Sequence, residues 1–218
     1  IASIVSANTT AGFSIVTWTG DGSSATVGHG LGVVPKLYIM KRRDSANYWW
    51  AGTTAVDGSL DFGELDTTAA FGASSLTVPT SSVFYTDGSQ NTNNETYVAY
   101  VFAEIVGYSK FGKYIGNGTT NGAFINTGFQ PAYILIKNAS ATDNWHICDV
   151  TRSIGNPHND ILRLNLHNLE SSDHASFDVD SCATGFKIKS TNSELNTNNN
   201  NYFYMAFAEF PAKYANAR

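Results

Sequence analysis

An internal duplication is the feature that most constrains the fold of this 218-residue chain. The run at residues 97–104, Tyr-Val-Ala-Tyr-Val-Phe-Ala-Glu, is matched at 202–209 by Tyr-Phe-Tyr-Met-Ala-Phe-Ala-Glu. The same four residues, Asn-Thr-Asn-Asn, stand shortly before each run, at 91–94 and 196–199. Repetition of a long pattern indicates that two segments build the same supersecondary unit. The chain is therefore expected to contain two similar domains.

The two copies keep a constant register. The offset is 96 residues from the pair Gly20 and Gly116 to the pair Trp49 and Trp145, and it is 105 residues at the closing runs. The second copy thus carries nine more residues after Trp145, and loops absorb insertions of this size at small entropic cost. We predict two domains, residues 1–107 and 108–218.

Short segments with alternating apolar and polar residues indicate β-strands throughout the chain. Residues 13–18, 162–167 and 185–189 alternate with a period of two, and Gly-Asp-Gly at 20–22 is a hairpin signal. Such segments recur about every ten residues with turn signals between them, which is the spacing of sandwiches and barrels. No amphipathic helical pattern is present. The predicted fold class is all-β, with two tandem homologous β-sandwich repeats that are jelly-roll or concanavalin-like.

Charge and hydropathy exclude several classes of partner. The net charge is −5, and the only basic run, residues 41–43, is too short for a nucleic-acid surface. No apolar stretch approaches the roughly 18 residues of a membrane span, so no membrane insertion is expected. The two cysteines, Cys148 and Cys182, are interpreted as ordinary thiols. The start at Ile1, without a signal-like segment, suggests a fragment or a processed product.

Four segments together resemble the C-terminal repeats of tailed-phage tail-fibre and receptor-binding proteins. They are residues 8–41, 128–137, 202–209 and 213–218, and the resemblance extends over nearly the whole chain. It implies a virion-surface module of a tail or appendage, made in the host cytoplasm, that attaches to a host cell-surface glycan or protein. It also implies contacts with other virion subunits and a homotrimer. The family has no known catalytic signature, so the resemblance implies no enzyme.

The residues themselves offer no catalytic or metal-binding constellation. The five histidines match no zinc spacing, and neither a Gly-x-Ser-x-Gly elbow nor a phosphate-binding glycine loop occurs. A glycosidase needs two facing carboxylates, and no pair can be assigned among Glu64, Glu170 and Glu194. Calcium is the alternative to no cofactor at all, but EF-hand spacing is absent and solvated loop carboxylates are the favoured interpretation. The aspartates weighed as calcium ligands are Asp57, Asp61, Asp66, Asp173, Asp178 and Asp180.

The duplication separates candidate binding residues from residues that the fold requires. Trp49 and Trp145 match in both copies and are expected in the core. Neighbours in a strand point to opposite faces, so Tyr48 and Trp50 are expected outside, as a platform for sugar rings with arginine donors nearby. The alternative is that these aromatic side chains are covered by the other copy or by another subunit. The predicted receptor- or glycan-binding residues are Arg42, Arg43, Tyr48, Trp50 and His146.

Three functions are weighed on this basis. The first is a non-catalytic module that binds a host receptor, in most cases a glycan. The second is a structural decoration or assembly domain of the virion with no receptor of its own. The third is a polysaccharide depolymerase, which the missing carboxylate pair disfavours. The Asn-rich run at 192–201 is interpreted as a hairpin loop, because Asn tolerates turn conformations, with glycan contact as the alternative.

Overall fold

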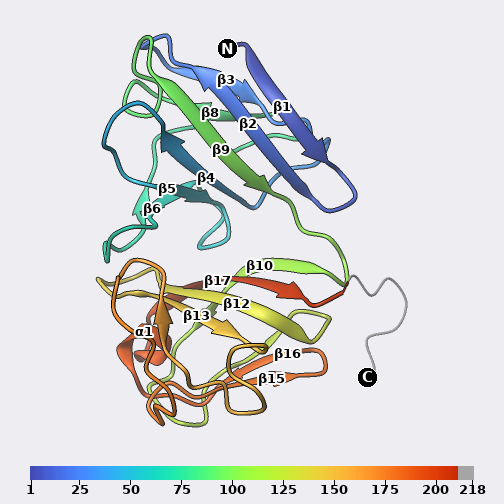
Figure 1. Ribbon diagram of the computed structural model, residues 1–218, viewed down its shortest axis with the longest axis vertical. Helices are drawn as coiled ribbons and strands as arrows, with labels where there is room; N and C mark the ends of the chain where they lie inside the picture. The colour runs from blue at the N-terminus through green and yellow to red at the C-terminus, as the bar shows by residue number, and fades with distance from the viewer. Residues whose placement is uncertain (211–218) are drawn as a thin grey trace. The chain divides into compact units, whose positions relative to one another are not determined.

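The computed structural model describes residues 1–210, and its regular secondary structure consists almost entirely of β-strands (Figure 1). Seventeen strands and one four-residue helix are found in this part of the chain, so the predicted all-β class is confirmed. The chain forms two compact units. The first unit comprises residues 1–65 and 71–105, and the second comprises residues 66–70 and the chain from 106 onward. The segment 213–218, which contributed to the family resemblance, lies outside the described residues.

Nine strands build the first unit. They form one large and one small sheet, and all neighbouring strands in both sheets are antiparallel. The strands are β1 (Ser3–Asn8), β2 (Phe13–Thr19), β3 (Ala25–Gly28), β4 (Leu37–Arg42), β5 (Trp50–Thr53), β6 (Asp61–Glu64), β7 (Gly72–Ala73), β8 (Val83–Thr86) and β9 (Thr96–Phe102).

The core of the first unit lies between its two sheets. The larger sheet has the order β1-β2-β9-β4-β5-β6-β7, and β3 pairs with β8 in the smaller one. Trp18 of β2 stacks on Tyr97 of β9 at 5.2 Å between ring centroids. Tyr38 of β4 stacks at 5.0 Å on Phe84 of the small sheet. Because alternate residues of each strand face this core, the period of two seen in the sequence marks its inner face.

The second unit also has two antiparallel sheets. The strand predicted at 162–167 is only two residues long, because a turn closes after it with a hydrogen bond from the Leu166 amide to the Arg163 carbonyl. The elements are β10 (Ser109–Ile115), β11 (Phe124–Asn126), β12 (Pro131–Asn138), β13 (Trp145–Asp149), β14 (Leu162–Arg163), β15 (Val179–Cys182), β16 (Gly185–Ile188), α1 (Ser193–Asn196) and β17 (Asn201–Ala208).

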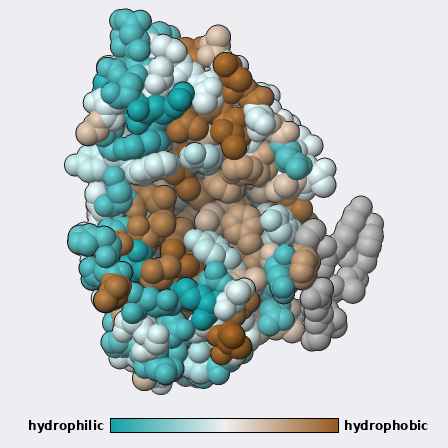
Figure 2. Space-filling model, in the orientation of Figure 1, coloured by the Kyte–Doolittle hydropathy of each residue, from teal (hydrophilic) through white to brown (hydrophobic). Residues whose placement is uncertain are grey.

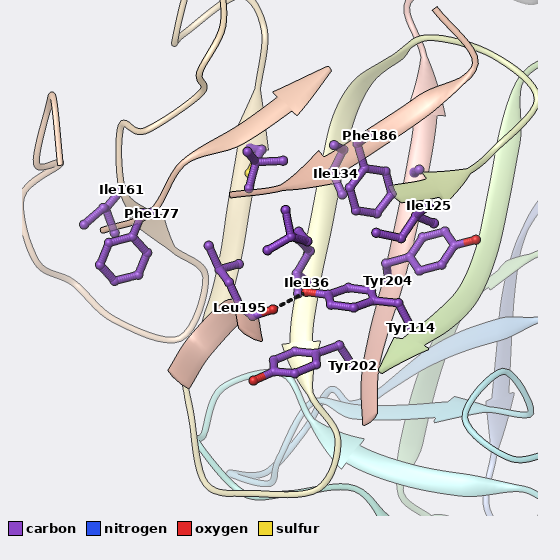
Figure 3. Close-up of a cluster of buried hydrophobic side chains, with 14 of the residues drawn as sticks. Tyr114, Ile125, Ile134, Ile136, Ile161, Phe177, Phe186, Leu195, Tyr202 and Tyr204 are labelled. Atoms are coloured by element: carbon purple, nitrogen blue, oxygen red, sulfur yellow. Dashed lines mark hydrogen bonds between the residues drawn. The ribbon is translucent and has the colours of Figure 1, made fainter. Parts of the chain in front are cut away.

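The core of the second unit lies between a five-stranded sheet, β10-β17-β12-β13-β14, and a three-stranded sheet, β11-β16-β15. Figure 3 shows Tyr114 in the middle of this cluster, where its hydroxyl donates to the Leu195 carbonyl at 2.7 Å. Its ring stacks on Tyr202 at 4.9 Å. Leu195 belongs to α1, whose first turn is capped by the Asn192 side chain. The Asn-rich run therefore forms a capped helical turn and the start of β17, where a hairpin loop was expected.

The same hydrogen bonds recur in the two units at the offsets found in the sequence. Asn91 Nδ2 donates to Asp21 Oδ1 at 2.7 Å and to a carbonyl two residues further on at 2.8 Å. Asn196 Nδ2 donates to Asn117 Oδ1 at 3.0 Å and again to a carbonyl two residues further on, at 2.7 Å. Both Asn side chains are fully buried. These hydrogen bonds connect the turn after β2 to the segment that precedes β9, and the turn after β10 to the segment that precedes β17.

Glycines at matched positions in the two units lie in close contact with the backbone that precedes the closing strands. A Cβ on Gly20 would lie 2.1 Å from the Thr92 carbonyl oxygen, and one on Gly116 would lie 2.1 Å from the Thr197 carbonyl oxygen. Only glycine fits where backbone approaches this closely. The glycines that set the register of the sequence repeat are therefore required by the packing of each unit.

Candidate functional site

The β4–β5 hairpin brings together four of the five predicted binding residues. Arg42 is the last residue of β4, Trp50 is the first of β5, and Arg43 and Tyr48 lie in the loop between them. The Arg42 guanidinium pairs with Glu95 and, at 3.4 Å, with Asp44. These ion pairs leave Arg42 engaged within the protein. Arg43 and Tyr48 are exposed, so they are the members of the predicted set that a ligand can reach.

The two tryptophans of this hairpin have the reverse of the expected orientation. Trp50 lies opposite Met40 and packs edge-on against Phe62 at 6.1 Å, on the core side of the sheet. Trp49 lies on the other face, where its ring stacks on Tyr100 at 6.4 Å and the Lys41 Nζ is 5.6 Å from the ring centroid. The expectation that Trp50 points outward is wrong, because the register of β5 places position 50, and not 49, toward the core.

His146 belongs to the second unit and is fully buried, so it is not a surface contact for a receptor. It lies on the core side of β13 opposite Arg163 and stacks on Phe177 at 5.3 Å. Its pKa is lowered to about 3, mainly by burial, with contributions from the nearby positive charges of Arg163 and Arg152. The imidazole is therefore neutral at physiological pH. Its matched partner in the first unit, Trp50, also faces the core, so this position serves packing in both units.

A buried ion pair lies beside His146. Glu194 accepts two hydrogen bonds from Arg163 Nε, at 2.8 and 3.0 Å, and one from Asn144 Nδ2 at 2.8 Å. His146 Nδ1 is 3.9 Å from Glu194 Oε2, and the imidazole is neutral, so this contact is not an ion pair. The Glu194 side chain is only 7 % exposed. This cluster has the burial and pairing of a structural ion pair.

A second buried contact pairs a histidine with a serine, as a catalytic base is paired with a nucleophile, but both side chains are inaccessible to a substrate. His158 Nε2 lies 3.0 Å from Ser181 Oγ, and its Nδ1 lies 2.7 Å from the Ser153 carbonyl. The Ser181 hydroxyl also reaches the Pro131 carbonyl at 3.2 Å. His158 and Ser181 are 4 % and 6 % exposed, whereas a nucleophile has to meet its substrate. We interpret the contact as structural, because it holds β15 against the neighbouring segments at His158 and Pro131.

The carboxylates, histidines and thiols of the described residues form no metal site. Within residues 1–210, no three His, Cys, Asp or Glu side chains are grouped as a metal site would require, and this includes the six aspartates weighed as calcium ligands. Cys148 and Cys182 are both free, and burial raises the pKa of the Cys148 thiol to about 12. In the same part of the chain, no helix is long and apolar enough to cross a membrane.

An open groove of about 540 Å³ lies in the first unit, outside the predicted set of binding residues. It is lined by strands β3 and β8, by the turn before β3 and by residues 75–77. The lining combines one aromatic ring, Tyr85, one carboxylate, Asp21, and an apolar contact, Leu76. The exposed polar side chains that complete the lining carry hydroxyl groups, and they are Ser24, Thr26, Ser75 and Thr77, whereas the side chain of Thr86 is fully buried.

Strand alternation places Tyr85 in this groove. Its neighbour Phe84 is fully buried in the core, so Tyr85 points to the opposite side of the small sheet, across from Thr26. In the second unit the outward-facing residue of the matching strand β16 is Lys187, which lies between the fully buried Phe186 and Ile188 and opposite Phe124. Its Nζ donates to the Gly122 carbonyl at 3.1 Å. The outer side of this strand thus carries a lysine in the second unit and Tyr85 in the first.

Asp21 is held rigidly at the edge of the groove. Its Oδ1 accepts hydrogen bonds from the Ser23 amide at 3.0 Å, the Ser23 hydroxyl at 2.8 Å and Asn91 Nδ2 at 2.7 Å. The hydrogen bonds from Ser23 are the main reason that the pKa of Asp21 lies below its usual value, and Asn91 adds to the effect. The carboxylate is therefore ionised at physiological pH. Its Oδ1 is occupied, while Oδ2 receives none of these bonds.

The groove residues were not predicted from the sequence. Segment 83–86 was not identified as a strand, because it has only four residues and its match in the second copy has a different sequence. One signal in the sequence points to the groove: the comparison of copies favours positions that differ, and no tyrosine in the segment 185–189 repeats Tyr85. The sequence pattern marks Asp21 only as part of a hairpin turn.

A comparison with known proteins places the chain in a family whose activity is unspecified. The family model described as "Domain of unknown function (DUF7483)" matches residues 1–211. No curated protein and no solved structure matches the chain. The geometry described above is therefore the basis for any functional assignment.

Proposed function

This chain belongs to the DUF7483 family, and we propose that it is a non-catalytic module of a phage virion surface that binds a host cell-surface glycan. The observation that carries the proposal is the groove of the first unit, with Tyr85, Asp21 and a lining of hydroxyl groups. Its volume falls in the range of about 300–1,000 Å³ that is usual for small-ligand sites. The virion location rests on the resemblance to tail-fibre and receptor-binding proteins.

The chemistry of the groove suits a sugar ring. The face of a pyranose is lined by C–H groups that pack on an aromatic side chain such as Tyr85. Sugar hydroxyls both donate and accept, as do the Ser and Thr side chains around the groove. An ionised carboxylate forms stronger hydrogen bonds with donor hydroxyls than a neutral acceptor does. Asp21 can supply that acceptor through Oδ2.

We further propose that the two units are homologous β-sandwich repeats, in which the fold is duplicated and the groove is not. The matched Asn91 and Asn196 contacts support this, as do the matched glycines and the shared strand register. A module with one shallow groove binds weakly, so attachment would depend on several copies acting together. A homotrimeric appendage, which the family resemblance implies, would supply them.

Tyr85→Ala tests the groove directly. We expect binding to host-cell polysaccharide or to a glycan array to weaken by about three- to tenfold, the usual cost of losing one stacked ring. Tyr85→Lys is the matched control for folding, because the outer side of the matching strand in the second unit carries a lysine, Lys187. This variant should lose binding equally while leaving thermal stability close to that of wild type.

Tyr48→Ala separates the groove from the β4–β5 hairpin. This exposed tyrosine belongs to the predicted set but does not line the groove, so the variant should bind as wild type does. Loss of binding by Tyr48→Ala, with normal binding by Tyr85→Ala, would move the site to the hairpin. Normal binding by both variants would contradict a site at either place.

The alternative is a structural decoration or assembly domain, and exposed apolar side chains favour it. On β1 and β2, Ile4 and Ile15 are 79 % and 39 % exposed, and Figure 2 shows hydrophobic residues at the surface over this sheet edge. Apolar patches at an edge strand mark interfaces. Ile4→Glu should then change the oligomeric mass without affecting glycan binding. A depolymerase is a weaker alternative, since Glu170 and Glu194 are each engaged with an arginine.

A further inference from the structure

We infer that the groove of the first unit selects neutral saccharides over acidic ones, and that Asp21 is the specificity-determining residue. This inference rests on the proposed glycan-binding function and adds the class of sugar. Asp21 is the one carboxylate among the residues that line the groove, and no lysine, arginine or histidine side chain lines it. The lining therefore carries a fixed negative charge with no cationic side chain to receive a sugar carboxylate.

The position of the charge is set by the fold. Three hydrogen bonds from Ser23 and Asn91 end on Oδ1, and Asn91 is fully buried beneath the turn. Asp21 is thus unable to swing away from a ligand without breaking a buried contact. Its Oδ2 can accept from a sugar hydroxyl, whereas a uronate or sialate carboxylate at the same place would bring two negative charges together.

Electrostatics sets the size of the expected discrimination. Two unit charges about 5 Å apart at a partly solvated surface repel enough to change an affinity on the order of tenfold. This effect should shrink as salt is added, because the groove is open to solvent and exposed charges are screened. Hydroxyl and ring contacts, by contrast, are nearly independent of salt.

The α-amino group of Ile1 is a second charge near the groove, and the binding experiment has to separate its effect from that of Asp21. Ile1 is one of the lining residues, and its α-amino group donates to the Thr26 carbonyl at 2.9 Å, so a free amino terminus adds a positive charge near the groove. An amide nitrogen at the same position can make this hydrogen bond without the charge. The binding experiment should therefore use a chain with Gly-Ser added before Ile1, in parallel with the chain that starts at Ile1.

We expect the Asp21→Asn variant to fold normally. The matched turn of the second unit has Asn117 in this place, with the same contacts to the residue two positions on and to a buried Asn. Removal of the charge should therefore leave the turn intact. A melting temperature close to that of wild type would show this before any binding is measured.

The test uses pairs of oligosaccharides that differ only in oxidation of C6 from hydroxymethyl to carboxylate, such as glucose- and glucuronate-based pairs. Each pair is measured by calorimetry at low and high salt. Wild type should bind the neutral member about tenfold more tightly at low salt, and Asp21→Asn should bring the two affinities within about threefold of each other.

Each outcome decides a different claim. Equal affinities in wild type, or a preference that Asp21→Asn leaves unchanged, would overturn the role of Asp21 and leave glycan binding in place. If no neutral or acidic member binds while Tyr85→Ala also has no effect on host-cell attachment, both the proposed function at this groove and the inference are overturned.

Discussion

Glu194→Ala is expected to lower the free energy of unfolding of the second unit by about 3–5 kcal/mol, the usual cost of removing one partner from a buried ion pair. The Glu194 side chain is 7 % exposed and accepts hydrogen bonds from both Arg163 and Asn144. Without it, the Arg163 charge would remain in a partly buried place with no counter-ion. Urea unfolding followed by tryptophan fluorescence measures the loss.

A double-mutant cycle distinguishes the ion pair from simple loss of packing. Arg163→Met removes the other charge while keeping a long apolar stem over Phe177, whose ring lies 5.4 Å from the guanidinium carbon. The double variant should be destabilised by clearly less than the sum of the single variants. Additive losses, or a Glu194→Ala loss below about 1 kcal/mol, would show that the pair does not stabilise the fold.

The second unit should also lose stability in acid through His146. Its pKa is about 3 in the folded chain and near 6.5 when the chain unfolds, so the unfolded state alone takes up a proton between these values. Stability is therefore unaffected by this group above pH 6.5 and falls as the pH drops from 6.5 toward 3. The loss attributable to His146 should reach about 3 kcal/mol at pH 4.

His146→Phe is the variant that isolates this term. Phenylalanine keeps the stack on Phe177 and cannot be protonated, and the matched position in the first unit already carries an aromatic residue, Trp50. Unfolding free energies of both proteins should be compared at pH 8 and pH 4. The gap between them should widen in acid by about 3 kcal/mol, and a constant gap would show that His146 is not buried in its neutral form.

The elements that sequence reasoning predicted are those with a strong local pattern. The closing strands β9 and β17 repeat an alternating run, and the turns at Gly20 and Gly116 repeat a backbone approach that only glycine permits. Local pattern and packing agree at these places, so the strands and turns could be recognised without the fold. The short strand β14 shows the limit, because its alternation continued beyond the point where a turn ends the pairing.

The candidate site could not be predicted in the same way, because the pairing between strands decides which side chains are exposed. Whether Trp49 or Trp50 faces the core depends on where β5 joins β4, and a shift of one residue exchanges the two faces. His146 inherited the error, since its exposure was inferred from that of Trp50. The groove combines segments near Asp21, Leu76 and Tyr85 that are far apart in the chain, and nothing local in the sequence brings them together.

The two units share the residues that support their turns, but they differ at the groove. The fold needs the buried Asn91 and Asn196, and both copies keep them. Tyr85 is not repeated, because the outer side of β16 carries Lys187. A binding role for the first unit would account for this difference between the units.

The most direct test of this account is an NMR titration of the ¹⁵N-labelled chain with a neutral oligosaccharide released from the host surface. The account predicts saturable shifts of the amides of Asp21, Thr26 and Tyr85, and no comparable shifts in the hairpin loop at Arg43 and Tyr48. Saturable shifts confined to that loop or to the second unit, with the groove amides unmoved, would contradict it.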